Sequence, residues 1–402
     1  MQGYLQPQKK LITKTIWQLS FVSLFTDMAG EMLYPVTPLY LKSIGFSVLA
    51  IGILEGIAEA VAGLTKSYFG SMSDAKGRRL PFVQIGYALS SISRPMVALF
   101  AAPVWVFFSR TLERLGKGIR TGARDALLSD ETTPSTKATV FGFHRSMDTV
   151  GAVIGPAIGL VYLHFNKDSY RNLFFLAFIP GLLAVIATLL IKEKPKPATI
   201  QYEQKQPGIF SFAHYWKKSP PEYKKLVIGL LGFALFNSSD VFLLLKMKEN
   251  GLSTEAVVGI YIFYNLVFAL LAYPMGIVAD QAGLKKIFLF GLCIFATVYF
   301  GFAFTNNMIV YTVLFFLYGL YAAATESISK AWISNIAPKS ETATAIGTYM
   351  GFQSIATLIA SSFAGFIWYK FGSAVSFLIT AIVTLLVVFY LSSMQFAKQR
   401  RQ

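Results

Sequence analysis

Apolar runs recur along the whole chain, each about 20 residues long, with short polar turns between them. A helix needs about 20 predominantly apolar residues to cross a hydrocarbon core of about 30 Å. The pattern therefore predicts an all-α membrane protein. We expect twelve transmembrane helices, near residues 16–41, 48–70, 80–101, 103–127, 138–163, 170–191, 225–246, 254–276, 286–304, 308–332, 342–368 and 373–394.

The predicted spans fall into two groups of six, separated by a polar stretch rich in Lys and Pro. We divide the chain into an N-terminal six-helix bundle (1–191), a cytoplasmic linker (192–224) and a C-terminal six-helix bundle (225–402). Termini and linker are placed in the cytoplasm because Lys and Arg concentrate in the loops on their side of the membrane.

Two stretches repeat between the groups. GSMSDAKGRR at 70–79 matches GIVADQAGLK at 276–285, and SDETTPSTKATVFG at 129–142 matches SNIAPKSETATAIG at 334–347. The offsets of 206 and 205 residues agree closely. Internal repeats of this kind are typical of transporters whose site lies near the bilayer midplane between the repeats.

Composition changes the interpretation of the net charge. The 402 residues carry a formal charge of +16, although only 14% are charged and 54% are hydrophobic. The excess of Lys and Arg in the loops explains this charge by membrane orientation. We therefore expect a multi-pass protein of the plasma (inner) membrane, with the lipid bilayer as a partner and no nucleic-acid partner.

The predicted spans nevertheless contain many ionisable side chains. Each costs about 2.5–3.5 kcal/mol near the bilayer centre, so they should face one another or water inside the bundle. The basic ones are Lys66, Arg94, Arg110, Arg114, Lys117, Arg120, Arg124, Arg145 and Lys330. The acidic ones are Asp27, Glu31, Glu55, Glu59, Glu113, Asp125, Asp148, Asp240 and Glu326.

The fourth predicted span concentrates basic residues on one side. At 100° per residue, its Arg and Lys side chains from 110 to 124 fall within an arc of about 120°. Asp27 and Glu31 lie four residues apart on the first span, and Glu55 and Glu59 do so on the second. The acidic faces of these helices are predicted to meet the basic stripe.

The loop GSMSDAKGRR resembles the G-x-x-x-D-R-x-G-R-R motif of the major facilitator superfamily, in the same place between the second and third spans. The matching residues are Gly70, Asp74, Gly77, Arg78 and Arg79, whereas Ala75 replaces the usual Arg. The resemblance implies the fold of that superfamily, with this loop as a cytoplasmic latch.

The fifth span resembles the G-x8-G-x3-G-P-x2-G-G motif of the superfamily's drug:proton antiporters. The matching residues are Gly142, Gly151, Gly155, Pro156 and Gly159, with Leu160 in place of the last Gly. Glycines four residues apart allow helices to approach closely, and Pro156 is expected to kink this one. Arg114 and Gly118 resemble an R-x-x-Q-G motif that is associated with proton transfer, although Lys117 replaces its Gln.

These patterns predict a proton-coupled secondary transporter that exports a small organic molecule by alternating access. Burial and nearby charges determine whether a carboxyl group holds a proton, so an acid beside Arg114 can couple proton transfer to conformation. The predicted proton-coupling residues are Asp27, Glu31, Arg114 and Asp148. We expect a monomer, no enzyme activity, no cofactor and no metal site.

The charge of the substrate stays open. The acids and aromatic walls favour a drug-like cationic or neutral amphiphile, whereas the basic stripe favours an anionic metabolite, such as a polycarboxylate or siderophore, in either direction. The predicted substrate-binding residues are Glu55, Glu59, Arg94, Arg110, Lys117, Phe236, Asp240, Tyr261, Tyr264 and Glu326.

Overall fold

The computed structural model describes residues 11–167, 169–193 and 211–394. Their regular secondary structure is entirely helical. Among helical residues, the side chains of Val48, Leu49, Gly52, Glu55, Ala60, Ser211, Phe212, Ala213, Thr254 and Glu255 are not described. The predicted role of Glu55 thus falls on a side chain outside the described part.

The first half of the chain forms α1 to α7. Their bounds are α1 (Lys14–Leu33), α2 (Thr37–Ser43), α3 (Val48–Ala75), α4 (Leu80–Leu99), α5 (Pro103–Asp130), α6 (Lys137–Phe165) and α7 (Tyr170–Leu189). The first span breaks at Tyr34–Val36, where Pro35 follows the end of α1. A Pro removes a backbone donor and clashes with the preceding turn, so the continuous helix expected over 16–41 is replaced by two.

The second half forms α9 to α15, preceded by the short helix α8 (Ser211–Lys218) within the predicted linker. The bounds are α9 (Pro221–Ala234), α10 (Val241–Glu249), α11 (Thr254–Ala282), α12 (Leu284–Phe304), α13 (Met308–Ile336), η1 (Lys339–Glu341), α14 (Thr342–Phe371) and α15 (Ser373–Ser393). Its first span also breaks, at the polar segment FNSSD between α9 and α10.

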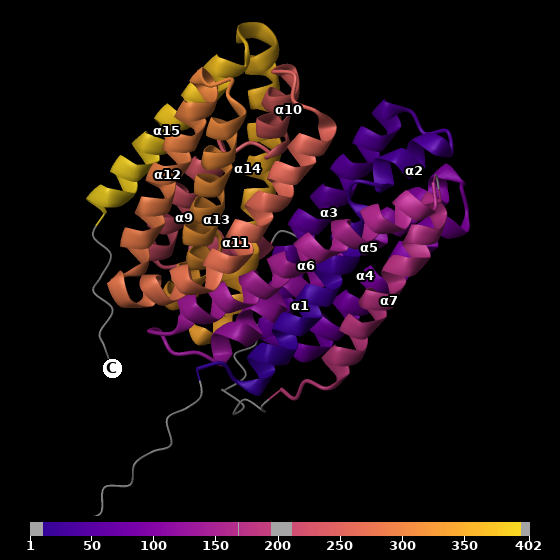
Figure 1. Ribbon diagram of the computed structural model, residues 1–402. Coiled ribbons are helices and arrows are strands. Elements are labelled where there is room, and N and C mark those ends of the chain that lie inside the picture. Colours follow the sequence, from indigo (N-terminus) through magenta and orange to yellow (C-terminus); the bar gives the residue numbers. More distant parts are fainter. Residues whose placement is uncertain (1–10, 168, 194–210, 395–402) are drawn as a thin grey trace, which may run out of the picture.

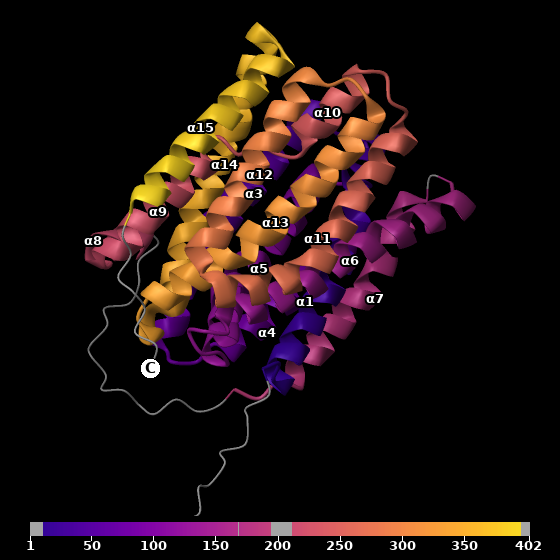
Figure 2. The same cartoon turned by 60° about the vertical axis from the view of Figure 1, so that its left-hand side comes forward.

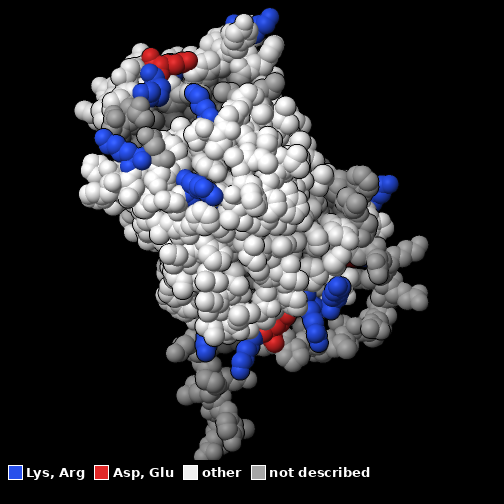
Figure 3. Space-filling view, turned by 90° about the vertical axis from the view of Figure 1, so that its right-hand side faces the viewer, with Lys and Arg blue, Asp and Glu red and all other residues white. Residues whose placement is uncertain are grey.

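Long apolar helices cover the outside of the molecule. By length and composition, α6, α7 and α11 to α15 could each cross a membrane, and large hydrophobic side chains such as Leu270 and Phe389 are exposed on them. Figure 3 shows a broad band without charged residues between charged groups gathered toward the two ends. This surface suits a hydrocarbon environment.

The two halves lie side by side and meet along two helix pairs (Figures 1 and 2). α6 of the first half packs along α11 of the second, and α3 packs along α14. The polar and close contacts between these helices fall on the part of each that is nearer the linker and the loop 75–80. We call this end of the molecule the linker face and the opposite end, which carries α2 and α10, the far face.

Candidate functional site

Close packing of α1 against α6 brings two carboxyl groups together. A Cβ on Gly151 of α6 would lie only 2.3 Å from the carbonyl oxygen of Leu24 in α1, so this crossing requires glycine. The approach places the Asp27 carboxyl of α1 close enough to the Asp148 carboxyl of α6 for the two groups to interact. Because two ionised carboxylates repel each other at short range, such a pair is more stable with a proton on one of them.

Asp148 is held by two further groups, one of which also contacts Arg124. Ser23 of α1 donates a hydrogen bond to its Oδ1, and Nη1 of Arg145 lies 2.7 Å from its Oδ2. Nε of Arg124 lies 2.9 Å from the neighbouring Asp125, and its Nη1 donates to Ser23 at 3.3 Å. The carboxyl pair therefore sits within a polar network that fixes one of its members more firmly than the other.

Arg145 links this network to the second half. Its Nη2 lies 2.6 Å from Oε2 of Glu326 in α13, and its guanidinium stacks 5.0 Å from the ring centroid of Phe268. The side chains of Arg145 and Glu326 are 35% and 42% exposed. Water therefore reaches an ion pair that joins the halves at the depth of the apolar helices.

The predicted basic stripe of α5 divides into two sets. Arg94 and Arg110 are buried and both pair with Glu113, at 3.5 Å in the case of Arg94. Arg94 also donates to the carbonyl oxygen of Thr26 at 2.9 Å. In this conformation these two side chains hold α4, α5 and α1 together.

The second set of the α5 stripe reaches solvent. Arg114 lies 3.4 Å from Glu59 of α3, whose side chain is 46% exposed, and Lys117 is exposed. Glu31 of α1 interacts electrostatically with Lys117 and Arg114. The structure thus brings Glu31, Glu59, Arg114 and Lys117 together on three helices of the first half.

Tyrosines surround a single acid in the second half. The Tyr318 hydroxyl donates at 2.9 Å to Asp240, the last residue of the break between α9 and α10. The ring centroids of Tyr264 and Tyr318 are 5.1 Å apart, and those of Tyr261 and Tyr264 are 6.0 Å apart. Phe236 lies outside this group and packs against Phe363 at 5.9 Å.

A second ion pair between the halves lies deeper. Nζ of Lys330 in α13 is 2.9 Å from Oδ2 of Asp125 in α5, and Arg124 lies 2.8 Å from the other oxygen. Asp125 is fully buried. Residues 125 and 330 are equivalent in the repeat with the 205-residue offset, and that correspondence is the sequence signal for a pair that sequence reasoning missed.

Equivalent aspartates close the linker face. Asp74 at the end of α3 accepts hydrogen bonds from N and Oγ1 of Thr344, both at 2.8 Å. Asp280 at the end of α11 accepts from N and Oγ1 of Thr139, both at 2.7 Å. Each carboxylate thereby caps the first turn of a helix in the other half, α14 or α6, where backbone N–H groups lack helical partners.

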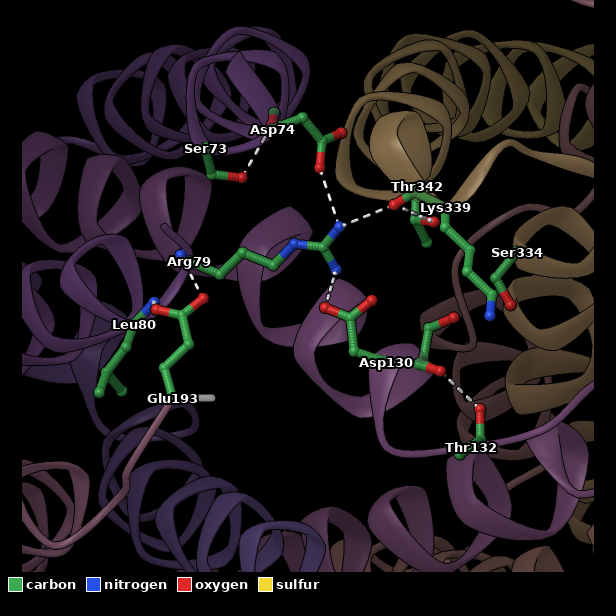
Figure 4. Close-up of polar contacts among 12 residues, drawn as sticks. Ser73, Asp74, Arg79, Leu80, Asp130, Thr132, Glu193, Ser334, Lys339 and Thr342 are labelled. Atoms are coloured by element: carbon green, nitrogen blue, oxygen red, sulfur yellow. Dashed lines mark hydrogen bonds and ion pairs between the residues drawn. The ribbon is translucent and has the colours of Figure 1, made fainter. Parts of the chain in front are cut away.

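Arg79 connects this closure to the first half (Figure 4). Its guanidinium lies 3.0 Å from Asp74 and 2.8 Å from Asp130, and it donates to the carbonyl oxygen of Lys339 at 3.2 Å. Glu193, four residues beyond the end of α7, accepts from the backbone N–H groups of Arg79 and Leu80 at 2.8 and 3.0 Å, which caps α4.

Sequence reasoning found only part of the linker-face closure. It identified Asp74 and Arg79 but missed Asp130, Glu193 and Asp280. Gly77 has a φ of +62° that glycine readily adopts, and Arg78 is exposed.

The remaining predicted glycines lie at helix crossings. A Cβ on Gly70 would lie 2.5 Å from the carbonyl oxygen of Ala343, and one on Gly142 would lie 2.4 Å from that of Ala272. Gly155 and Gly159 face α1 in the same manner as Gly151. α6 continues through Pro156 without a break.

In the described part of the chain, no cluster of three His, Cys, Asp or Glu residues could hold a metal ion.

The family model of the Major Facilitator Superfamily matches residues 19–271 and 244–400. An uncharacterized MFS-type transporter of Methanocaldococcus jannaschii is 30% identical over 381 residues, covering 93% of each chain. The quinolone resistance protein NorA of Staphylococcus aureus is 25% identical over 228 residues, 56% of this chain and 58% of NorA.

Solved structures show the same fold. The human organic anion transporter MFSD10 has a TM-score of 0.75 at 15% identity, covering 96% of this chain and 100% of its own. The Escherichia coli fucose:proton symporter FucP also has a TM-score of 0.75, at 11% identity, covering 95% of this chain and 98% of its own. The chain belongs to the major facilitator superfamily and is a multi-pass membrane transporter, not an enzyme.

Proposed function

We propose that the protein is a proton-coupled secondary transporter that exports a small organic molecule by alternating access. The observation that carries the proposal is the proximity of the Asp27 and Asp148 carboxyl groups where α1 crosses α6, which favours a shared proton. Arg145 joins Asp148 to Glu326 of the other half. The protonation state of the pair is therefore connected to a contact between the two halves.

The mechanism follows from competition for Arg145. Loss of the shared proton leaves two carboxylates that repel each other and draw Arg145 toward the first half, which weakens its bond to Glu326. Proton binding has the opposite effect. A ligand shifts a conformational equilibrium only by its different affinity for the two states, and here the proton is that ligand. Glu31 and Arg114, the other proposed coupling residues, border the same water-exposed region.

Orientation and direction complete the proposal. We orient the protein with its linker face in the cytoplasm, because the basic loops favour that side. In this orientation the described conformation is closed toward the cytoplasm. Export is supported by the partial similarity to a protein named for quinolone resistance. Together with the antiporter motif of α6, this similarity favours exchange of protons for a drug-like substrate, with the protein acting as a monomer.

For the substrate we propose a cationic or neutral amphiphile. Asp240 and the tyrosines around it offer one negative charge beside several aromatic rings, which favours organic cations. An anionic metabolite is the second candidate, because Lys117 is exposed and Arg114 is 20% exposed in the same region. The name of one structural neighbour, an organic anion transporter, supports that alternative.

The proton assignment is tested with Asp27→Asn and Asp148→Asn in proteoliposomes. An amide cannot release a proton, so accumulation driven by a pH gradient should fall to background, whereas exchange of labelled for unlabelled substrate without a gradient should persist. Glu222→Gln, at an exposed acid of the linker face, is the matched control. Accumulation that stays coupled to the gradient in both variants would show that the pair does not carry the proton.

Substrate charge is tested on the same preparation. Asp240→Asn should weaken binding of organic cations and leave anions unaffected, and Lys117→Gln should do the reverse. Thermal stabilisation of the purified protein gives the readout, because a ligand that binds only the folded state raises its apparent stability. Weakening by Lys117→Gln alone, with a panel of anions, would favour the second candidate.

A further inference from the structure

The short helix α8 lies beside α9 at the linker face (Figure 2). It packs against α14 of the second half and α3 of the first. Its inner side is aromatic. Tyr215 is buried, with its ring centroid 5.3 Å from that of Tyr223 in α9, and Trp216 lies 5.8 Å from Phe352 of α14. These contacts hold α8 flat on the protein.

The outer side of α8 and the first turn of α9 are basic. Lys217, Lys218 and Lys225 are exposed. Lys224 donates to the carbonyl oxygen of Lys217 at 2.9 Å, which ties the two helices together. Two acids lie nearby. Glu341 binds Lys218 at 3.1 Å and Glu222 is exposed, so the lysines outnumber the acids.

The basic cluster borders the lipid-facing surface. Ile228 follows Lys224 by one turn of α9 and is 49% exposed, and α9 packs against α15, whose Leu386 and Phe389 are also exposed. The surface therefore changes from lysines to apolar side chains within one helical turn. Amphipathic helices with Lys and Trp occupy this boundary between lipid headgroups and acyl chains.

We propose that α8 and the first turn of α9 form a binding site for the headgroups of anionic phospholipids, with Lys217, Lys224 and Lys225 as the main contacts. Clusters of about four lysines beside a membrane helix attract anionic lipids. In the proposed orientation the site faces the cytoplasmic leaflet.

Lipid at this site should also favour closure of the linker face. α8 contacts both α3 and α14, and Lys218 holds Glu341 in η1. The same η1 contains Lys339, whose carbonyl oxygen accepts from Arg79 (Figure 4). A headgroup that fixes α8 in place therefore stabilises the arrangement in which these helices of the two halves lie together. This consequence rests on alternating access as proposed above, whereas lipid binding itself does not.

The test compares lipid binding by the full chain in detergent and in nanodiscs. Native mass spectrometry and thermal unfolding are measured with phosphatidylglycerol and phosphatidylcholine. The wild-type protein should retain phosphatidylglycerol and be stabilised by it. In K217Q/K224Q/K225Q the affinity for phosphatidylglycerol should fall about a hundredfold, since each lysine contributes about fivefold. K217R/K224R/K225R should keep most of the wild-type affinity for phosphatidylglycerol.

A matched control separates this site from general charge. K14Q/K192Q/K286Q removes the same charge from exposed lysines of the linker face outside α8 and α9, and it should bind as wild type does. Equal loss in the control, unchanged binding in K217Q/K224Q/K225Q, or equal stabilisation by inorganic phosphate would each overturn the proposal. No substrate or pH gradient is involved, and nanodiscs present the lipid in both leaflets. A failure of proton coupling or of the proposed orientation therefore leaves this result intact.

Discussion

The two halves place their closing elements at equivalent positions, yet they present different chemistry to each other. Asp74 and Asp280 cap equivalent helices across the interface. Near the centre, the first half contributes the carboxyl pair and the basic residues of α5, whereas the second contributes tyrosines around Asp240. The repeat thus preserves the parts that bring the halves together, and the groups between them are free to differ. This difference favours the first half as the location of the proposed proton chemistry.

The largest expected effect comes from the pair that joins equivalent positions of the halves. Asp125→Asn leaves the buried Arg124 and the partly buried Lys330 without their carboxylate, which should destabilise the protein by about 3–5 kcal/mol. Lys330→Met should lower the free energy of unfolding less, because Arg124 still neutralises Asp125. Denaturation of both variants and of the double variant measures the coupling. If the effects are additive, the pair does not link the halves.

Glycine substitutions separate packing within a half from packing between halves. Gly142→Ala places a Cβ against α11 and Gly151→Ala places one against α1, so each should cost about 1–3 kcal/mol. Only Gly142→Ala should also push the halves apart at the linker face. Maleimide labelling of Ile53→Cys in a Cys293→Ser background measures this separation, because Ile53 is exposed on α3 toward the far face. If the halves move apart at the linker face, access to residue 53 at the opposite end should change. Equal labelling in both variants would contradict the distinction.

The aspartate caps test whether the two halves close equally. Asp74→Ala and Asp280→Ala each remove a carboxylate from a helix N-terminus, which should cost about 1 kcal/mol. Asp74→Ala should have the larger effect, since Arg79 also loses a partner. Thermal unfolding measures both. A larger effect of Asp280→Ala would show that closure depends mainly on the crossing of α6 with α11.

The smallest expected effect concerns the tyrosines. Tyr318→Phe removes the hydroxyl that donates to Asp240, a change of about 0.5–1.5 kcal/mol. It should alter substrate affinity and leave proton coupling unchanged. Tyr311→Phe is the control, because its hydroxyl donates to the carbonyl oxygen of Thr305 at the end of α12. Altered coupling in Tyr318→Phe would mean that the second half also takes part in proton transfer.

The hydrophobic pattern predicts the helices of this fold well, because a bilayer leaves few alternatives to long apolar helices. It missed both helix breaks. Pro35 was a usable signal for the first, whereas FNSSD reads as a polar interruption only when its neighbours are known. It also missed α8, whose eight residues are too short for a periodic signal.

The site was predicted in part. The identity of the ionisable groups could be predicted, since the membrane makes each of them conspicuous. Their pairing could not, because it depends on which helices cross. Arg94 and Arg110 share Glu113, whereas Arg114 reaches Glu59 of another helix. The contact of Asp27 with Asp148 depends on the glycines of α6, which the sequence did show.

Away from the linker face, two close contacts between the halves lie at equivalent positions of the repeat. On one side, a Cβ on Gly351 would lie 3.1 Å from the carbonyl oxygen of Gly63, and on the other, Ser146 donates to the carbonyl oxygen of Ala269. A rigid body held at two points can turn only about the line through them. Under the alternating access proposed above, that line is the expected rocking axis, and rotation about it would close the far face as it opens the linker face.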